Sequence, residues 1–223
     1  MKKVFYVDGI PNEITKSIFL AGPTPRNGAC KSWRQDAIRI LEEKGYDGTV
    51  IIPEAKDFTG NYDNLEYQGI IDFERARLNL CDVILFWVPR SDLLPAFTTN
   101  IEYGNFIKTG KIVIGAPKDA PKTGYLRYMA SERNMPFFDS LEDTINETLK
   151  VIGNGVLRQK DEVLVPLNIY NDEYFKNWHK GLENKEITSL VTEFYNDKNW
   201  LIRVDLKDNE SMEIQKDILV FKS

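Results

Sequence analysis

The sequence predicts an α/β fold, in which a mostly parallel sheet of about five strands is covered by helices and followed by a small C-terminal α+β appendage. Strand-like and helix-like segments alternate over the first two-thirds of the chain, as in βαβ units. Val83–Val88 is an unbroken apolar run, which a strand buried on both faces requires. Beyond Gly153-Asn154-Gly155 the pattern changes to β-rich stretches. We therefore expect an α/β domain over residues 1–153 and a small α+β domain over residues 154–223.

The predicted strands of the first domain are short apolar segments that end at turn residues. The first stops at Ala21-Gly22-Pro23 and the second at Pro53, because proline and glycine interrupt a buried strand. The strands are expected at Ser17–Leu20, Thr49–Ile52, Val83–Val88, Lys111–Gly115 and Phe137–Phe138, with Lys3–Val7 as a candidate edge strand.

Helices are predicted where apolar residues recur at helical spacing. Ser32 is the expected cap of the first helix, whose apolar stripe includes Ala37 and Leu41 and ends at Gly45. Further helices are expected over Leu65–Leu80, from near Thr99 to Gly110, over Thr123–Arg133 and over Ser140–Ile152.

The C-terminal appendage combines one helix with strands. The helix is expected over Asp172–Asn184, and the strands over Ile187–Tyr195, Trp200–Leu206 and Ile218–Phe221, with Asn- and Asp-rich turns between them. Trp178, His179 and Trp200 form either an aromatic binding surface or the core of this small unit. The core is favoured, because a small unit needs large side chains to be stable.

Composition and charge exclude several classes of function. The net charge of −5 and the lack of a Lys/Arg run argue against nucleic-acid binding. No apolar run approaches the roughly 20 residues that span a bilayer, and the first residues lack the features of a signal peptide, so we expect a cytoplasmic protein. Cys30, Cys81 and the single histidine, His179, show no metal-ligand spacing, which predicts free thiols and no metal site.

Three clusters of polar residues follow predicted strands and should converge at one edge of the sheet. The first is the turn from Gly22 to Gly28, in which glycine permits close backbone approach and Thr24 and Arg26 offer donors to an anion. The alternative is an ordinary strand-to-helix connection with a surface arginine.

The second cluster is Asp72-Phe73-Glu74, on the helix before the central strand. Two acids separated by two positions point about 200° apart on a helix, so at most one can face the crevice at the sheet edge. A solvated helix face is the alternative for either acid.

In the third cluster, Thr98 to Gly104, we expect Glu102 on the first turn of the helix that follows the apolar strand. Glu102 is a candidate nucleophile there. The alternative is a capping box, in which Thr98 or Thr99 caps the helix and Glu102 stabilises its start.

In this order, the three clusters resemble the nucleoside 2-deoxyribosyltransferase family, including its branch related to 2′-deoxynucleoside 5′-phosphate N-hydrolases. The resemblance covers roughly residues 15–152. It is carried by Leu20-Ala21-Gly22-Pro23 with Arg26 and Trp33, by the segment from Glu74 through Asp82 to Trp87, and by Asn100-Ile101-Glu102-Tyr103-Gly104.

The resemblance implies an activity and roles for individual residues. In that family a glutamate in the position of Glu102 attacks C1′ of the sugar, and a second base or water resolves the covalent glycosyl-enzyme. Glu74 is implied as the second catalytic acid, which holds the sugar or a proton. Substrate-binding roles are implied or expected for Gly22, Pro23, Thr24, Arg26, Asp72, Thr98, Thr99 and Asn100.

The resemblance also implies a flavodoxin-like doubly wound sheet, no metal or organic cofactor, and a homodimer or larger homo-oligomer. The partner is a small-molecule nucleoside or nucleotide. The predicted function is cleavage of its N-glycosidic bond, with transfer of the sugar to another base or to water.

The chain departs from the family pattern at Ala96, six residues before Glu102, where transferases carry aspartate and the monophosphate hydrolases carry serine. Thr98, Thr99 or Asn100 are the candidate substitutes. Two other functions stay open: cleavage of NAD with nicotinamide as the leaving base, and a non-catalytic nucleotide sensor or sponge that uses the appendage to bind a partner.

Overall fold

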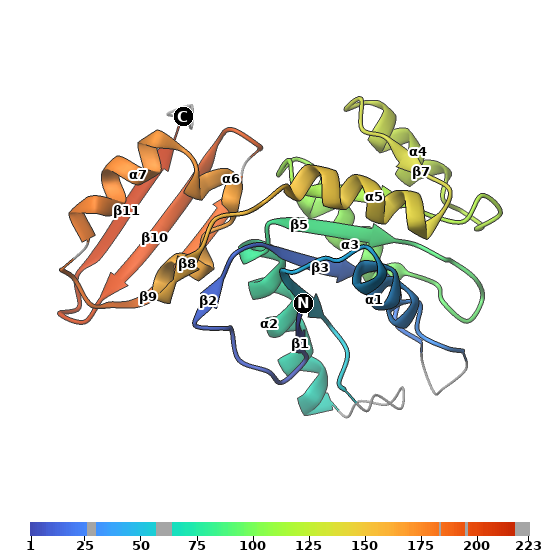
Figure 1. The fold of residues 1–223 in the computed structure, drawn as a ribbon, viewed down its shortest axis with the longest axis horizontal. Coiled ribbons are helices and arrows are strands. Elements are labelled where there is room, and N and C mark those ends of the chain that lie inside the picture. The colour runs from blue at the N-terminus through green and yellow to red at the C-terminus, as the bar shows by residue number, and fades with distance from the viewer. Residues whose placement is uncertain (26–29, 57–63, 183, 195, 217–223) are drawn as a thin grey trace.

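The computed structural model describes residues 1–25, 30–56, 64–182, 184–194 and 196–216. Its first part contains a six-stranded sheet in the order β1-β4-β3-β5-β6-β7, and every neighbouring pair is parallel (Figure 1). The expected flavodoxin-like α/β class is confirmed, and the N-terminal segment adds an edge strand beside β4. The strands are β1 (Lys2–Phe5), β3 (Ser17–Ala21), β4 (Thr49–Ile52), β5 (Val83–Trp87), β6 (Ile112–Gly115) and β7 (Phe137–Phe138).

Helices cover both faces of this sheet, so the central strands are buried on both sides. Leu41 of α1 and Ile145 of α5 pack on one face, whereas Phe73 of α2, Tyr103 of α3 and Leu126 of α4 pack on the other. The two-sided burial explains the unbroken apolar runs of β3 and β5. The helices are α1 (Arg34–Glu43), α2 (Asn64–Leu80), α3 (Phe97–Phe106), α4 (Gly124–Ser131) and α5 (Leu141–Ile152).

The strand order reverses between β3 and β5. The chain passes from β3 to β4 on one side and then returns to β5 on the other. Ligands of open parallel sheets bind at such a switch point, in the crevice beyond the carboxyl ends of the strands. The topology therefore brings the turn after β3 and the loop after β5 to the same edge.

The C-terminal appendage is an antiparallel sheet in the order β11-β10-β9, covered by α7. Trp200 is buried at its centre, Trp178 packs against the same core, and His179 stacks on the buried Phe175 with ring centroids 5.2 Å apart. These aromatic residues pack in the core of the appendage, which confirms the interpretation that the sequence analysis preferred. The appendage contains α7 (Glu173–His179), β9 (Ile187–Phe194), β10 (Trp200–Leu206) and β11 (Ser211–Lys216).

The third strand of the appendage differs from the sequence prediction. The observed strand is Ser211–Lys216, and the predicted one, Ile218–Phe221, lies outside the described residues. Several short elements were not expected from the sequence. These are β2 (Glu13–Ile14), β8 (Arg158–Gln159), α6 (Leu167–Tyr170) and two 3₁₀ turns at Lys160–Leu164 and Lys180–Leu182.

The appendage docks at the amino ends of the strands, opposite the switch-point crevice. Asp82, at the start of β5, accepts hydrogen bonds from both terminal nitrogens of Arg158, at 2.8 and 2.6 Å, and from the backbone N–H of Leu167. Both partners of this ion pair are buried. Figure 1 shows the appendage on the side from which β3 and β5 point away, so it does not cover the carboxyl edge.

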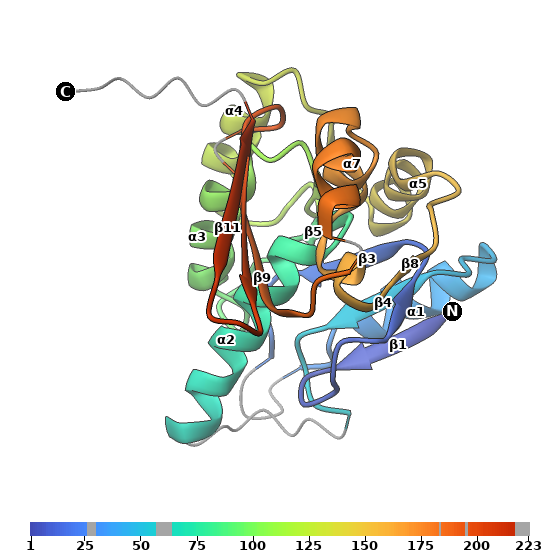
Figure 2. The ribbon, with the colours of Figure 1, turned by 90° about the vertical axis from the view of Figure 1, so that its left-hand side faces the viewer.

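Lys111 forms a second connection at the amino edge. Its buried ammonium donates to the carbonyls of Leu78, Asn79 and Cys81, which closes the C-terminal end of α2. The same ammonium lies 4.8 Å from the ring centroid of Phe194 in β9, and β9 packs beside α2 in Figure 2. The appendage is thus held through buried cationic groups.

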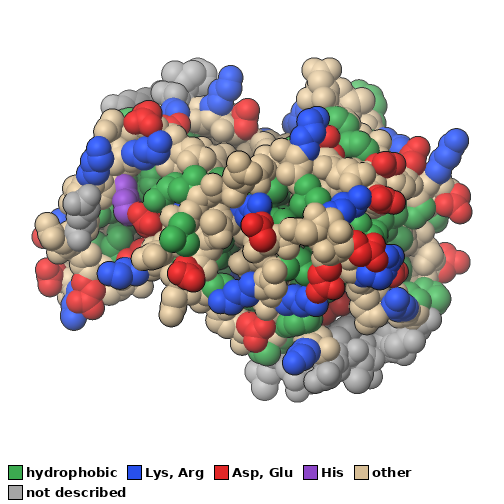
Figure 3. Space-filling model, in the orientation of Figure 1, with side chains coloured by type: hydrophobic (Ala, Val, Ile, Leu, Met, Phe, Trp, Pro, Cys, Tyr) green, Lys and Arg blue, Asp and Glu red, His purple; other side chains and the backbone are tan. Residues whose placement is uncertain are grey.

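The surface shown in Figure 3 carries interspersed acidic and basic side chains rather than a basic patch, in keeping with the net charge of −5. Within the described residues, no helix is long and apolar enough to cross a membrane.

Candidate functional site

The candidate site lies at the carboxyl edge of the sheet, where β3, β4 and β5 end. The turn Gly22–Thr24, here called the Gly22 turn, follows β3 and lies against the end of β5. A Cβ atom on Gly22 would lie 2.2 Å from the carbonyl oxygen of Trp87 and 2.8 Å from the ring of Trp33. Glycine is required because no side chain fits between the turn and the neighbouring strand.

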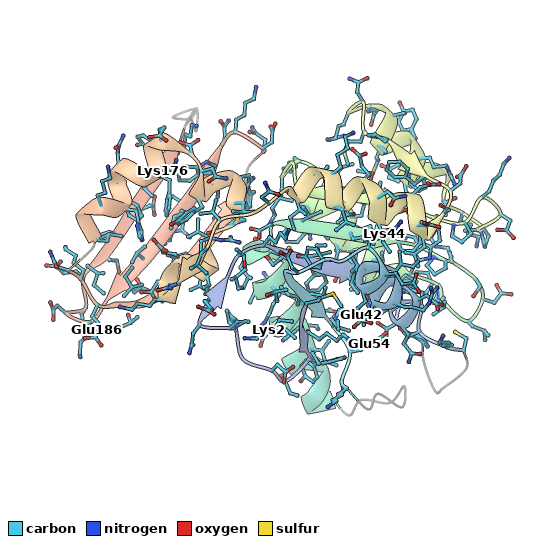
Figure 4. The ribbon with its side chains drawn as sticks, in the orientation of Figure 1. Lys2, Glu42, Lys44, Glu54, Lys176 and Glu186 are labelled. Carbon is cyan, nitrogen blue, oxygen red and sulfur yellow. The ribbon has the colours of Figure 1, made fainter. Side chains whose placement is uncertain are left out.

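A buried arginine holds the Gly22 turn by hydrogen bonds. The guanidinium of Arg34, on the first turn of α1, donates to the carbonyls of Leu20 and Gly22 at 2.9 and 2.7 Å, and to Thr24 Oγ1 at 3.1 Å. It also forms an ion pair with Glu54 Oε1 at 2.6 Å. Figure 4 labels Glu54 beside α1, far from Lys176 and Glu186 of the appendage.

Two carboxyl groups, here called the carboxyl pair, are half-buried near this arginine: Glu74 on α2 and Glu102 on α3. Burial raises the pKa of Glu74 to about 7, and the charge of Arg34 opposes the rise. Burial raises the pKa of Glu102 to about 8; the charge of Glu74 raises it further, and Arg34 again opposes the rise. The pair is therefore close enough to repel, and around neutral pH it holds protons that exposed glutamates have lost.

The start of α3 differs from the prediction. The helix begins at Phe97, preceded by Ala96 in the left-handed conformation at φ 59°, and no side chain caps it. Glu102 is the sixth residue of the helix and lies in its second turn, not in the first turn as expected. The capping-box alternative for Thr98 or Thr99 with Glu102 is wrong, because the helix starts before both threonines.

Glu74 lies on α2, Glu102 on α3 and the Gly22 turn after β3, and the charges of Glu74 and Arg34 both act on Glu102. The family described as nucleoside 2-deoxyribosyltransferase like matches residues 15–120. A comparison with curated proteins found no match.

The family match spans the segment from β3 to the loop after β6, which contains every element that contributes to the site. It agrees with the resemblance that the sequence motifs indicated. It supports a general role in glycosyl transfer or hydrolysis on a nucleoside-like small molecule. β1 and the appendage lie outside the matched segment.

The remaining expected site residues lie in different environments. Asp72 is exposed on α2, Thr98 is exposed on α3, and Thr99 is buried in the core. Asn100 is exposed, and its Oδ1 accepts a hydrogen bond of 2.5 Å from Arg90, which follows β5. Because Thr98 precedes Glu102 by four residues, it shares the helix face of that carboxyl.

The other members of the first cluster lie in or beside the Gly22 turn. Pro23 is buried and its carbonyl accepts from Trp33 Nε1 at 3.1 Å, which holds the tryptophan ring under the turn. Arg26, the expected anion-binding residue, lies outside the described residues.

Sequence reasoning missed Arg34 and Glu54. One signal was present: Arg34 lies on the stripe that also contains Ala37 and Leu41, all buried against the sheet. A charged residue within the apolar stripe of an amphipathic helix indicates a buried, paired charge. The partner could not be found from spacing, because Glu54 follows a different strand.

Replacing Gly22 by alanine should damage the site by steric overlap alone, because the alanine methyl group has no chemistry of its own. The new Cβ must displace the Trp87 carbonyl or the Gly22 turn, so we expect a loss of stability of about 1–3 kcal/mol and at least a tenfold loss of activity. Gly104→Ala is the matched control, since a Cβ there meets nothing within 4 Å on α3. It should raise the stability by about 0.5–1 kcal/mol. Thermal melts of both variants give the comparison; equal melting temperatures would refute the assigned contact.

Proposed function

We propose that the protein cleaves the N-glycosidic bond of a (deoxy)nucleoside or nucleoside 5′-monophosphate through a covalent intermediate on Glu102. The sugar is then transferred to another base or to water. The observation that carries this proposal is the half-buried carboxyl pair at the switch point of the sheet, within the segment that matches the family.

In the proposed first step, a carboxylate oxygen of Glu102 attacks C1′, and the C1′–N bond breaks with its electron pair leaving on the base, which takes up a proton. In the second step, water or another base attacks C1′ and releases Glu102 as a carboxylate. Glu74 orients a sugar hydroxyl or holds the proton in transit. Gly22, Pro23, Thr24 and Arg26 would bind the 5′ end.

The pH dependence of the reaction follows from the carboxyl pair. A nucleophile must be ionised, and burial together with the charge of Glu74 raises the pKa of Glu102 to about 8. We therefore expect kcat/KM to rise with pH up to about 8.

Glu74→Gln tests the interaction between the two carboxyl groups. Loss of the Glu74 charge removes one cause of the raised pKa of Glu102, so the rise of kcat/KM should move to lower pH. A profile that is flat from pH 5 to 9, or one that Glu74→Gln does not move, would contradict the assigned pair.

The substrate is found by measuring free base released from a panel of nucleosides, their 5′-monophosphates and NAD by chromatography. Glu102→Ala is the control in each case. Release from nucleosides or monophosphates supports the proposal, and release from NAD alone replaces it by NAD glycohydrolysis. Tight binding of a nucleotide with no turnover would identify a sensor instead of an enzyme.

A further inference from the structure

Exposed apolar side chains gather on one face of the protein, along α3 and α4. Phe97 and Ile101 of α3 are 71 and 65 % exposed, and Tyr125 and Tyr128 of α4 are 72 and 60 % exposed. Among the large apolar residues that the structure describes, only Val7 reaches such exposure. Single exposed apolar residues are ordinary, whereas a group of four indicates a surface that another molecule covers.

The four side chains form two stripes on neighbouring helices, here called the α3–α4 face. Spacings of four and three residues put both members of each pair on one side of their helix. The other side of each helix packs on the sheet through Tyr103 and Leu126, and the hydroxyl of Tyr103 donates to the Leu126 carbonyl at 3.3 Å. Figure 2 shows α3 and α4 on the side of the sheet opposite α5. The two stripes therefore point outward together.

Each stripe ends at a charged residue, and the two charges have opposite signs. Continuing the helical spacing leads to Lys108 just after α3 and to Glu132 just after α4, and both are exposed. Within the part of the chain that the structure describes, neither forms an ion pair with another residue. The α3–α4 face thus carries apolar groups flanked by one cation and one anion, which is a self-complementary pattern.

The apolar area of this face is suited to a stable interface. An aromatic side chain buries about 150–250 Å² when it is fully covered, so the exposed parts of these residues offer on the order of 400 Å². That is roughly half of the ~800 Å² per partner that a standard interface buries. The remainder of such an interface is a polar rim, for which Lys108 and Glu132 are suitable.

We propose that the α3–α4 face is the surface through which two copies of this chain form a symmetric dimer. A twofold axis parallel to the helices places α3 of one copy over α4 of its partner, in the same direction. The apolar side chains of α3 then meet the tyrosines of the second copy, and Lys108 meets the partner's Glu132. The family resemblance implied an oligomer without naming a surface, and this proposal does not rest on the proposed function.

The test is the dissociation constant of the full chain, measured by analytical ultracentrifugation. The wild type should be a dimer at micromolar concentration. Ile101→Lys places an unpaired charge within the apolar stripe and should raise the dissociation constant at least about a hundredfold. Val151→Lys is the matched control, because Val151 is 50 % exposed on α5, on the opposite side of the sheet. It should leave the constant unchanged.

Charge reversal tests the pairing of the two helices. Lys108→Glu brings like charges together at two symmetric places and should raise the dissociation constant by roughly tenfold. Combining Lys108→Glu with Glu132→Lys restores opposite charges, so the constant should return to near that of the wild type. Both positions are exposed, and circular dichroism checks that each variant is folded.

A wild-type chain that is still monomeric at about 100 μM would overturn the proposal. So would a dimer that Ile101→Lys does not weaken, or one that Val151→Lys weakens equally. A double charge reversal that fails to restore the dimer would overturn the assigned axis. None of these outcomes depends on turnover, so they stand apart from success or failure of the substrate panel.

Discussion

Glu102→Gln is expected to lower the rate of base release by at least about a thousandfold, because the amide cannot form the glycosyl ester on which the proposed reaction depends. The substitution keeps the shape of the side chain, so substrate binding should persist. Rapid-quench or chromatographic assays of base release at saturating substrate measure the effect on kcat. A fall of less than about tenfold would show that Glu102 is not the nucleophile.

The same variant should gain stability at alkaline pH. The pKa of Glu102 in the folded protein, about 8, lies above the 4.5 that is ordinary for a glutamate, so the folded protein binds more protons than the unfolded chain between these values. Stability of the wild type therefore falls as pH rises from about 4.5 to 8, and the glutamine variant avoids this loss. Its melting temperature should exceed that of the wild type by roughly 5 °C at pH 8 and be nearly equal at pH 4.5. Glu132→Gln, an exposed substitution just after α4, should show no such difference.

Arg158→Ala is expected to be the most destabilising of the substitutions considered. It leaves Asp82 as a buried carboxylate without its cation and also removes a donor to the carbonyl of Val165. Breaking a buried pair in this way costs about 3–5 kcal/mol, which for a chain of this size lowers the melting temperature by roughly 10 °C.

Arg203→Ala is the matched control for that substitution. Arg203 pairs with Glu193 and Glu213 on the face of the appendage sheet, and about half of its side chain is exposed. Exposed pairs contribute about 1 kcal/mol or less, so this variant should melt within a few degrees of the wild type. Equal destabilisation by the two substitutions would show that the Asp82–Arg158 pair does not anchor the appendage.

The sheet could be predicted from the sequence because each central strand is a buried apolar segment bounded by glycine or proline. The prediction of Thr49–Ile52 agrees with β4 at both ends, and Trp200–Leu206 agrees with β10. Such strands are determined locally, by burial on both faces and by the turns that follow. The division at Gly153 stays a prediction, since docking of the appendage joins both parts through Arg158.

The candidate site was harder to predict, because its partners are distant in sequence. Glu54 and Arg34 are separated by 20 positions, and at the opposite edge of the sheet Asp82 and Arg158 are separated by 76. No periodicity encodes such pairings. The start of α3 was missed for a different reason: Ala96 adopts a left-handed conformation that alanine rarely takes, so nothing in the residue types marked the boundary. This strained residue occupies the position at which the chain departs from the family pattern.

The covalent intermediate is tested most directly by trapping it. A nucleoside whose 2′-fluorine slows hydrolysis of the glycosyl ester should release its base and leave the fluorinated sugar on the protein. Mass spectrometry of the digested protein would locate it. We expect one sugar on the peptide that contains Glu102, and none in Glu102→Gln. Base release without an adduct, or an adduct on a different residue, would contradict the assignment of Glu102 as the nucleophile.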